Sequence, residues 1–287
     1  MRFRVRIWIT GSQGQLGHVL LNLLQKKGID SFGTTREEVD ISQEDQVRSR
    51  MKGVTHIINA AAFARVDPAE TEREKAFRAN AVGPEVLALA AREAGARLIH
   101  ISTDYVFDGT LGRPYREDDQ TNPVNWYGQT KLEGELRVQK AFPEACIVRV
   151  SWVFGGHGTQ QYVHAVLKML REKRELRFVA DQIGRPTYAH DLAEALIVLR
   201  DQSGIYHYAN RGAISKYDLT CAIWDWAKRK HLPLLCESVV PITAAEFLVP
   251  APRPLSTPFD TAKIEAILPI RSWEEALAEC MNRSSFS

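Results

Sequence analysis

The stretch "VRIWITGSQGQLGHVLLNLLQKKG", residues 5–28, joins a short apolar strand to an amphipathic helix through a glycine-rich turn. Apolar residues recur at helical spacing after the turn, and Gly28 ends the pattern. Gly11, Gly14 and Gly17 are spaced G-x-x-G-x-x-G. The first glycine permits a tight turn, the second lets backbone amides approach a pyrophosphate, and the third allows close packing of helix on sheet. This order of elements predicts a dinucleotide-binding unit at the start of the chain.

Strand and helix patterns alternate through the rest of the first half. Strands are predicted at residues 29–34, 55–62, 97–102 and 145–151, and helices at 81–95 and around Tyr127. Ser42, with Asp45, is expected to cap a further helix. Because the strands show little polar alternation, we expect a parallel sheet covered on both faces. The predicted fold class is α/β, a Rossmann-type doubly wound parallel sheet with a smaller C-terminal α/β substrate domain.

The pattern loosens after about residue 155. Helices are predicted at residues 159–173 and 190–201, and strands at 204–210 and 236–242. The proline-rich segment "VPAPRPLSTPFD", residues 249–260, is expected to be either a linker or a loop packed over a site. The dinucleotide-binding domain is predicted to span residues 1–155 and the substrate-binding domain mainly residues 156–287, where the chain can cross back.

Composition excludes several classes of protein. The 287 residues carry a formal net charge of +2, with both signs spread along the chain, which gives no reason to expect a nucleic-acid partner. No apolar run approaches the roughly 18 residues of a membrane span, and the first strand leaves no room for a signal peptide. We therefore expect a cytoplasmic protein without a membrane partner. Its four widely spaced cysteines are expected to be thiols, with two disulfides as the alternative.

The residues after the second predicted strand bear on the choice of cofactor. An acidic residue at the end of that strand would bind the ribose 2′-hydroxyl of NAD. Here the segment "FGTTREEVD", residues 32–40, has no acid before Arg36. Arg36 can face the 2′-phosphate of NADPH, although it can also be a solvated loop residue. NADPH is therefore the predicted cofactor, and NADH is the alternative.

A second motif lies in "NWYGQTKLEG", residues 125–134, where Tyr127 precedes Lys131 by four positions. Residues four apart share one helical face, but by itself such a pair is as ordinary as any two surface residues. However, "HISTDYVF" closes the fourth predicted strand and places Thr103 at its carboxyl end. Ligands of parallel sheets bind at that edge, where the glycine turn also lies. The convergence of these segments favours a catalytic pair.

These residue types suit the reduction of a ketone. Hydride transfer to a carbonyl leaves an alkoxide, and a phenol with a reference pKa of about 10 can donate the proton that it needs. The ammonium group of Lys131 is expected to stabilise the resulting Tyr127 phenolate and to reach the ribose hydroxyls of the cofactor. The hydroxyl of Thr103 is expected to hold the substrate carbonyl oxygen.

Several segments carry a resemblance to a known family. Besides the glycine turn, "HISTDYVFDG" and "YGQTKLEGE", they are "INAAAFARVDPAE", "RVSWVFG", "DQIGRPT" and "RPLSTPFDTAKI". With them the chain resembles the extended short-chain dehydrogenase/reductase superfamily, and most of all the dTDP-4-dehydrorhamnose reductase family, over nearly its whole length. The resemblance implies NADPH-dependent reduction of the 4-keto group of dTDP-4-dehydro-L-rhamnose to dTDP-L-rhamnose, for polysaccharide biosynthesis.

Two alternatives to this function stay open. One is a reductase of a different nucleotide 4-keto sugar, because reorienting one hydroxyl need not change any of these motifs. The other is a non-catalytic NADP-binding regulatory subunit, like that of methionine adenosyltransferase, which also resembles this family. The oligomeric state is open as well, with a homodimer as one option.

The resemblance also implies roles for individual residues. The catalytic residues would be Thr103, Tyr127 and Lys131. Besides Arg36, Tyr127 and Lys131, the cofactor would contact Gly11, Gln13, Gly14, Gln15, Leu16, Asp40, Ile41, Ala60, Ala61 and Ala62. The nucleotide-sugar substrate would contact Val66, Asp67, Asp104, Tyr105, Trp152 and Arg253. No metal site is expected among the eight histidines, and His190 is interpreted as a helix-start residue.

Some substrate positions have an alternative interpretation. Trp152 can stack on a sugar ring or be a core aromatic residue, and Arg253 can pair with a nucleotide diphosphate or be solvated. The late loop departs from the family pattern, R-P-x-N/D-S, because "RPLSTPFD" carries Leu255 and Ser256 there. Phe63 stands where the family often has a tyrosine or histidine. These departures make the sugar contacts less determined by sequence than the catalytic ones.

Overall fold

The computed structural model describes residues 5–157 and 161–283. Its centre is a six-stranded parallel sheet in the order β10-β5-β4-β3-β1-β2. The strands are β1 (Arg6–Thr10), β2 (Asp30–Thr34), β3 (His56–Asn59), β4 (Arg97–Thr103), β5 (Cys146–Val150) and β10 (Gly204–Tyr208). The main helices around the sheet are α1 (Gln15–Lys26), α2 (Glu44–Arg50), α5 (Gly83–Ala94), α6 (Trp126–Ala141) and α8 (Ala189–Leu199). A parallel sheet covered by helices on both faces confirms the predicted fold class.

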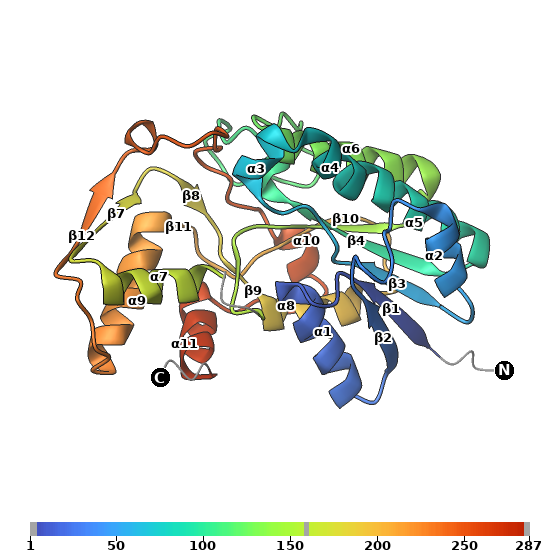
Figure 1. Ribbon diagram of the computed structural model, residues 1–287, viewed down its shortest axis with the longest axis horizontal. Coiled ribbons are helices and arrows are strands. Elements are labelled where there is room, and N and C mark those ends of the chain that lie inside the picture. Colours follow the sequence, from blue (N-terminus) through green and yellow to red (C-terminus); the bar gives the residue numbers. More distant parts are fainter. Residues whose placement is uncertain (1–4, 158–160, 284–287) are drawn as a thin grey trace.

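The side chains of β1 alternate between two hydrophobic cores. Ile7 and Ile9 pack into the core shared with α1 and α8, while Trp8 packs into the core shared with α2, α5 and α6. Figure 1 shows these two groups of helices on opposite faces of the sheet. All three side chains are fully buried, as expected for a strand at the centre of a doubly wound sheet.

The remaining elements build a smaller lobe beside the sheet. It contains three two-stranded sheets, in which β12 pairs with β7, β11 with β8 and β9 with β6. Its strands are β6 (Val153–Phe154), β7 (Glu175–Val179), β8 (Ile183–Gly184), β9 (Thr187–Tyr188), β11 (Ile214–Ser215) and β12 (Ser238–Ile242). Its helices, which lie together at one end of the molecule (Figure 1), are α7 (Tyr162–Glu172), α9 (Lys216–Arg229) and α11 (Trp273–Arg283). Side chains from all three share one apolar cluster. The first two residues of the helix predicted at 159–173 lie outside the described residues.

The chain crosses back from the smaller lobe to the central sheet. Helix α8 packs on α1, and β10 extends the sheet beyond β5 in parallel register, with Tyr206 beside Val148. Helix α10 (Ala262–Glu265) lies near β10 and adds Ile264 to the same core. Helix α8 and strand β10, residues 189–208, are therefore part of the domain built around the central sheet, although they follow residue 155 in sequence. That residues 1–155 and 156–287 form two separate domains stays a prediction.

Local structure departs from the sequence-based predictions in several places, among them α9 and the short strands β6, β7, β8, β9 and β11, which were not predicted. Ser42 does not cap α2: Gln43 occupies that position, and the Ser42 hydroxyl donates to Asp40 Oδ1 at 2.8 Å instead. This side-chain bond competes with capping, as short polar side chains often do. Three short helical segments between β3 and α5 were also not predicted. They are α3 (Val66–Thr71), α4 (Arg73–Phe77) and the π-helical turn η1 (Arg78–Val82).

The proline-rich segment, residues 249–260, is a loop without helix or regular strand. Asn125 Nδ2, at the start of α6, donates to the Pro252 carbonyl at 2.8 Å. Asp67 accepts from the Ala251 amide at 3.2 Å. The loop is thus fastened onto the central domain rather than left as a linker. Within residues 5–157 and 161–283, no helix combines enough length and hydrophobicity to cross a bilayer.

Candidate active site

The glycine turn packs tightly against the end of β3. Gly11 has a φ of 67°, and a Cβ there would lie 2.8 Å from Ala61 Cα. A Cβ on Gly17 would lie 2.2 Å from the Gly11 carbonyl oxygen, and one on Gly14 would lie 3.2 Å from it. Gly14 is also the cap of α1, so the backbone amides of the turn lie at a helix N-terminus. This turn, with glycine at the positions that leave no room for a Cβ, fits the diphosphate of a dinucleotide.

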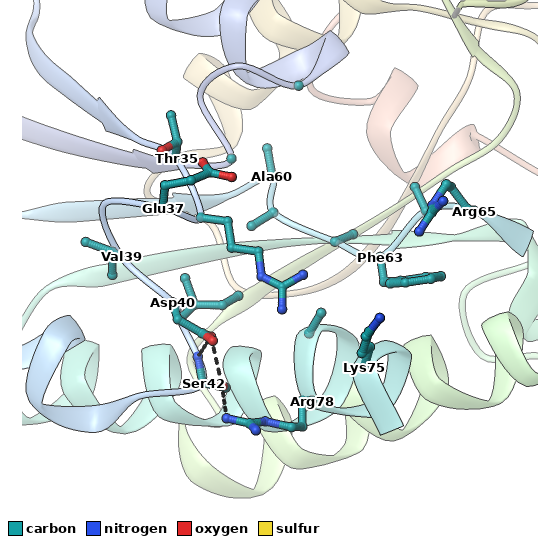
Figure 2. Close-up of a pocket in the computed structure, with 18 of the residues that line it drawn as sticks. Thr35, Glu37, Val39, Asp40, Ser42, Ala60, Phe63, Arg65, Lys75 and Arg78 are labelled. Atoms are coloured by element: carbon teal, nitrogen blue, oxygen red, sulfur yellow. Dashed lines mark hydrogen bonds between the residues drawn. The ribbon is translucent and has the colours of Figure 1, made fainter. Parts of the chain in front are cut away.

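A cavity of about 820 Å³ runs beside this turn (Figure 2). Nine of the residues predicted to contact a cofactor line it: Gly11, Gln13, Gly14, Arg36, Asp40, Ile41, Ala60, Ala61 and Ala62. Gln15, Leu16, Tyr127 and Lys131 are not among the residues that line it. The cavity therefore unites the glycine turn with the ends of β2 and β3, which is where a dinucleotide lies in sheets of this type.

Three basic residues that sequence reasoning missed line the same cavity. They are Arg65, Lys75 and Arg78, which come from the loop after β3, from α4 and from η1. Arg78 donates to the Ser42 hydroxyl at 3.2 Å, and Figure 2 shows it with Lys75 along one side of the groove. In the sequence, the three-residue spacing of Lys75 and Arg78 indicates only that they share a helical face. It does not indicate that this face lines a cavity. Four acidic residues, Glu37, Asp40, Glu72 and Glu74, line the cavity as well, and Glu72 pairs with both Arg65 and Lys75. Arg36 and Arg78 form no such ion pair in the part of the chain that the structure describes, which leaves these two arginines available to a phosphate.

Helix α6 places Tyr127 and Lys131 at the carboxyl end of β4. The Asn125 side chain caps the helix by accepting from the Gly128 amide at 2.8 Å. Lys131 is 2% exposed, and its Nζ donates to the Ile101 carbonyl of β4 at 2.6 Å. Thr103, the last residue of β4, lies within hydrogen-bonding reach of Tyr127. The structure thus brings these predicted catalytic side chains together at one edge of the sheet.

Burial dominates the electrostatics of this cluster. Burial raises the pKa of Tyr127 to about 12. The Asp104 carboxyl also raises this pKa, while the hydrogen bond with Thr103 lowers it. Burial lowers the pKa of Lys131 to about 8, while Glu135 raises it. Lys131 is not among the groups that shift the Tyr127 pKa in this structure, where its ammonium group donates to the Ile101 carbonyl. The expected stabilisation of the Tyr127 phenolate by Lys131 stays a prediction. Lys131 still carries a proton at neutral pH, because its pKa stays above 7.

The predicted substrate residues form a second cluster next to the first. Arg253 Nη2 lies 2.9 Å from Asp67 Oδ2, so the arginine of the proline-rich loop is paired rather than solvated. The Tyr105 ring meets the Tyr127 ring edge-on, with centroids 5.6 Å apart. Asp104, which is 2% exposed, accepts from Thr257 Oγ1 at 2.7 Å. Asp67 and Arg253, which are 186 positions apart in sequence, thus come together near Tyr105.

The two remaining predicted substrate residues are Val66 and Trp152. Val66 begins α3 and is half-buried beside Asp67. Trp152 is partly buried and has a φ of 48°, in the left-handed region that non-glycine residues seldom adopt. Its indole is packed against Gly184, where a Cβ would lie 2.6 Å from Trp152 Cε2. A further residue that sequence reasoning missed, Lys216, covers the ring, with Nζ 3.4 Å from its centroid.

Histidines and acids do not assemble a metal site in the part of the chain that the structure describes. His190 is the second residue of α8, as predicted, and its Nδ1 lies 3.4 Å from Arg283 Nη1. The buried His100, on β4, is kept neutral because burial and the positive charge of Lys131 hold its pKa well below 6.5. The chemistry of the cluster is therefore that of a phenol, an ammonium group and hydroxyls.

Comparison with known proteins agrees with this geometry. The RmlD substrate binding domain family matches residues 5–286. The spore coat polysaccharide biosynthesis protein SpsK of Bacillus subtilis is 37% identical, over 98% of this chain and 98% of its own. The dTDP-4-dehydrorhamnose reductase of Mycolicibacterium smegmatis is 40% identical, over 96% of this chain and 85% of its own.

A solved structure matches equally closely. It is the dTDP-4-dehydrorhamnose reductase of Bacillus anthracis in complex with NADP, with a TM-score of 0.91 and 33% identity. The match covers 98% of this chain and all of that one. Together the family match and the near-complete coverage of these relatives show that the chain belongs to the RmlD substrate binding domain family.

Proposed function

We propose that the protein is an NADPH-dependent reductase that converts the 4-keto group of dTDP-4-dehydro-L-rhamnose into the hydroxyl of dTDP-L-rhamnose. The observation that carries this proposal is the meeting of Thr103, Tyr127 and Lys131 with the glycine turn at one edge of the sheet. The dTDP-4-dehydrorhamnose reductases that match nearly the whole chain, and the NADP complex of one relative, support the same reaction. NADH is the alternative cofactor. Neither a different nucleotide sugar nor a non-catalytic regulatory subunit is favoured by these comparisons.

The residues around the glycine turn fit the cofactor. The turn would hold its diphosphate, the ends of β2 and β3 its adenosine half, and Arg36, with Arg78 nearby in the same lining, its 2′-phosphate. Lys131 would reach its ribose hydroxyls, since an ammonium group has three donors and the Ile101 carbonyl takes only one. When bound, NADPH supplies the hydride that reduces the substrate carbonyl.

Tyr127 would supply the proton. A phenol with a pKa of about 12 is still a much weaker base, once ionised, than the alkoxide that it protonates. Thr103 would donate to the carbonyl oxygen and hold it near the tyrosine, in the manner of one arm of an oxyanion hole. Lys131, protonated at neutral pH, would stabilise the phenolate as it forms.

Asp67, Asp104, Tyr105, Trp152 and Arg253 would bind the nucleotide sugar. Asp104 offers carboxyl oxygens to sugar hydroxyls, and Arg253 offers a guanidinium group to the diphosphate. Val66 would contribute apolar contact. We also expect the reaction to take place in the cytoplasm, and the homodimer stays a prediction.

The test is a reaction with purified components. The protein is mixed with NADPH and dTDP-4-dehydro-L-rhamnose, absorbance at 340 nm is followed, and the product is identified by mass spectrometry and NMR. We expect NADPH oxidation and dTDP-L-rhamnose. A product with the other configuration at C4 would point to a different sugar, and binding without turnover would point to a regulatory subunit.

A further inference from the structure

Lys216 lies outside every sequence motif described above, yet it sits among the predicted substrate residues. It is the first residue of α9, directly after Ser215, whose side chain caps the helix by accepting from the Asp218 amide at 2.9 Å. Its position in the fold is therefore set by a well-formed helix start in the smaller lobe. From there its side chain reaches toward the central sheet.

Two aromatic rings surround the ammonium group of Lys216. Its Nζ lies 3.4 Å from the ring centroid of Trp152 and 4.6 Å from that of Tyr162. The Tyr162 hydroxyl also donates to the Lys216 carbonyl at 3.1 Å, so both ends of the lysine are held. An ammonium group over an indole face is a favourable arrangement, and the more so when it is desolvated.

The charges around Lys216 come from two separate parts of the chain. Asp104, at the end of β4, and Arg253, in the proline-rich loop, both act on it electrostatically. Arg253 is itself paired with Asp67 at 2.9 Å. In the part of the chain that the structure describes, no carboxylate forms an ion pair with Lys216. Two cations therefore lie in the substrate cluster, and one of them lacks a direct acidic partner.

Removal from water makes this lysine receptive to an anion. Burial lowers the pKa of Lys216 to about 7, Asp104 raises it and Arg253 lowers it. An incoming anion would restore the protonated form, because a nearby negative charge favours an ammonium group. A diphosphate carries two such charges and would be the strongest anion in the proposed substrate.

We propose that Lys216 is a substrate-binding residue that, together with Arg253, binds the diphosphate of the nucleotide sugar while packing on Trp152. This inference rests on the proposed function, since it deepens the assignment of that site. In this assignment Lys216 packs on the indole of Trp152 and adds a second positive charge to the cluster that contains Arg253.

The chain offers a matched control for the aromatic contact. Lys228, on the same helix, lies over the Trp224 ring with Nζ 3.8 Å from the centroid. That lysine is 49% exposed and pairs with Asp225 at 2.8 Å. Both lysines make the same kind of ring contact, but only Lys216 does so within the substrate cluster.

The test is a set of calorimetric titrations in the presence of NADP⁺, with dTDP and thymidine as probes. Losing a charge-assisted contact to phosphate should weaken dTDP binding by Lys216→Met about 10- to 100-fold. Thymidine, which has no phosphate, should lose less than about threefold, and Lys216→Arg should keep most of the dTDP affinity. Lys228→Met should bind both probes like the wild type. Unchanged dTDP affinity in Lys216→Met, or equal losses for both probes, would overturn the assignment.

A second experiment uses the wild-type protein, so that the proposal can be tested even if the Lys216→Met variant does not fold. Brief acetylation with acetic anhydride, followed by peptide mass spectrometry, reports the reactivity of each lysine. We expect dTDP, but not thymidine, to protect Lys216, while Lys228 reacts equally in all samples. Reaction of Lys216 at the same rate with saturating dTDP would contradict the proposal. If the wild type neither binds dTDP nor reduces the substrate, the proposed function fails too. If it does both, but neither Lys216→Met nor protection from acetylation shows a role for Lys216, only this assignment fails.

Discussion

At the scale of single residues, Tyr127 and Lys131 illustrate how burial sets chemistry. Both side chains lie at the carboxyl end of β4, yet burial pushes their pKa values in opposite directions, to about 12 and about 8. The tyrosine therefore keeps its proton until a strong base forms next to it, and the lysine keeps its charge at neutral pH. Both features suit a donor that acts only on an alkoxide.

Replacing the tyrosine tests this directly. Tyr127→Phe removes one oxygen and keeps the ring that packs on Tyr105, so folding and NADPH binding should survive. Turnover should fall by roughly 10²- to 10⁴-fold, the usual contribution of a positioned general acid. Tyr206→Phe, in β10, is the control and should keep full activity. Steady-state NADPH oxidation is the measurement, and undiminished turnover in Tyr127→Phe would remove this tyrosine from the mechanism.

Arg36 can be tested through the difference between the two cofactors. Only NADPH has the 2′-phosphate, so Arg36→Ala should weaken NADPH binding by about 10- to 100-fold and NADH binding far less. Fluorescence titration of each cofactor measures both constants. Arg50→Ala, on the exposed end of α2, is the control for a general loss of positive charge. Equal losses for both cofactors would show that Arg36 does not contact the phosphate.

Asp104 should make stability depend on pH. Burial raises its pKa from 3.8 to about 6, although Thr257 and Thr103 lower it by hydrogen bonding. The folded state then holds this proton more tightly than the unfolded state, so the contribution is complete below pH 3.8 and is lost as pH rises through 6. The difference is on the order of 3 kcal/mol.

The matched variant for this prediction is Asp104→Asn, which cannot titrate. Urea unfolding of both proteins from pH 4 to pH 7.5 gives the free energy of unfolding at each pH. The difference between wild type and variant should change by up to about 3 kcal/mol in favour of the variant as pH rises. Parallel pH profiles would mean that Asp104 titrates normally.

At the scale of elements, the packing of α6 on η1 holds the site together. A Cβ on Gly134 would lie 2.1 Å from the Asn80 carbonyl oxygen, so the helix and the π-helical turn are in direct backbone contact. The Asn80 side chain in turn accepts from the Phe63 amide at 2.8 Å and donates to Thr130 at 3.0 Å. One asparagine therefore joins the cofactor groove to the helix that carries Tyr127.

Gly134→Ala should loosen this joint. The added methyl group has no room, so we expect the free energy of unfolding to fall by about 1–3 kcal/mol, as for other overpacked sites. NADPH affinity should also fall, because the same shift disturbs the loop at Phe63. Leu136→Ala, whose side chain is 53% exposed on the same helix, is the control. Chemical denaturation measures the effect, and a gain in stability, as alanine gives in an open helix position, would contradict it.

At the scale of the whole molecule, the second half of the chain completes the first. Helix α8 covers one face of the sheet beside α1, and β10 pairs with β5 along its full length. A fragment of residues 1–155 would expose the apolar side chains of that face to water. We therefore expect residues 1–155 to depend on the second half of the chain for stability, although the predicted division itself stays a prediction.

Expression of residues 1–155 alone tests this view. We expect a fragment that aggregates or unfolds without cooperativity and that binds a hydrophobic dye, because it lacks α8 and β10. The full chain, purified in parallel, should show one cooperative transition in circular dichroism. A fragment that unfolds cooperatively and binds NADPH would show that the first 155 residues form an independent domain after all.

Sequence alone determined the features that depend on neighbours along the chain. The strand, turn and helix around Gly11 follow from glycine spacing, and the shared face of Tyr127 and Lys131 follows from helix geometry. Thr103 could be placed beside them because strands in a parallel sheet end at a common edge. These inferences needed only local periodicity and one general rule of sheet architecture.

Tertiary structure alone decided the rest. Lys75 and Arg78 enter the cofactor groove because short helices fold back over it, and nothing in their own spacing says so. Arg253 meets Asp67 across 186 residues, and Lys216 reaches Trp152 only through the packing of the smaller lobe on the sheet. Contacts between segments far apart in sequence depend on how whole surfaces fit together, and a single sequence carries no local signal for that fit.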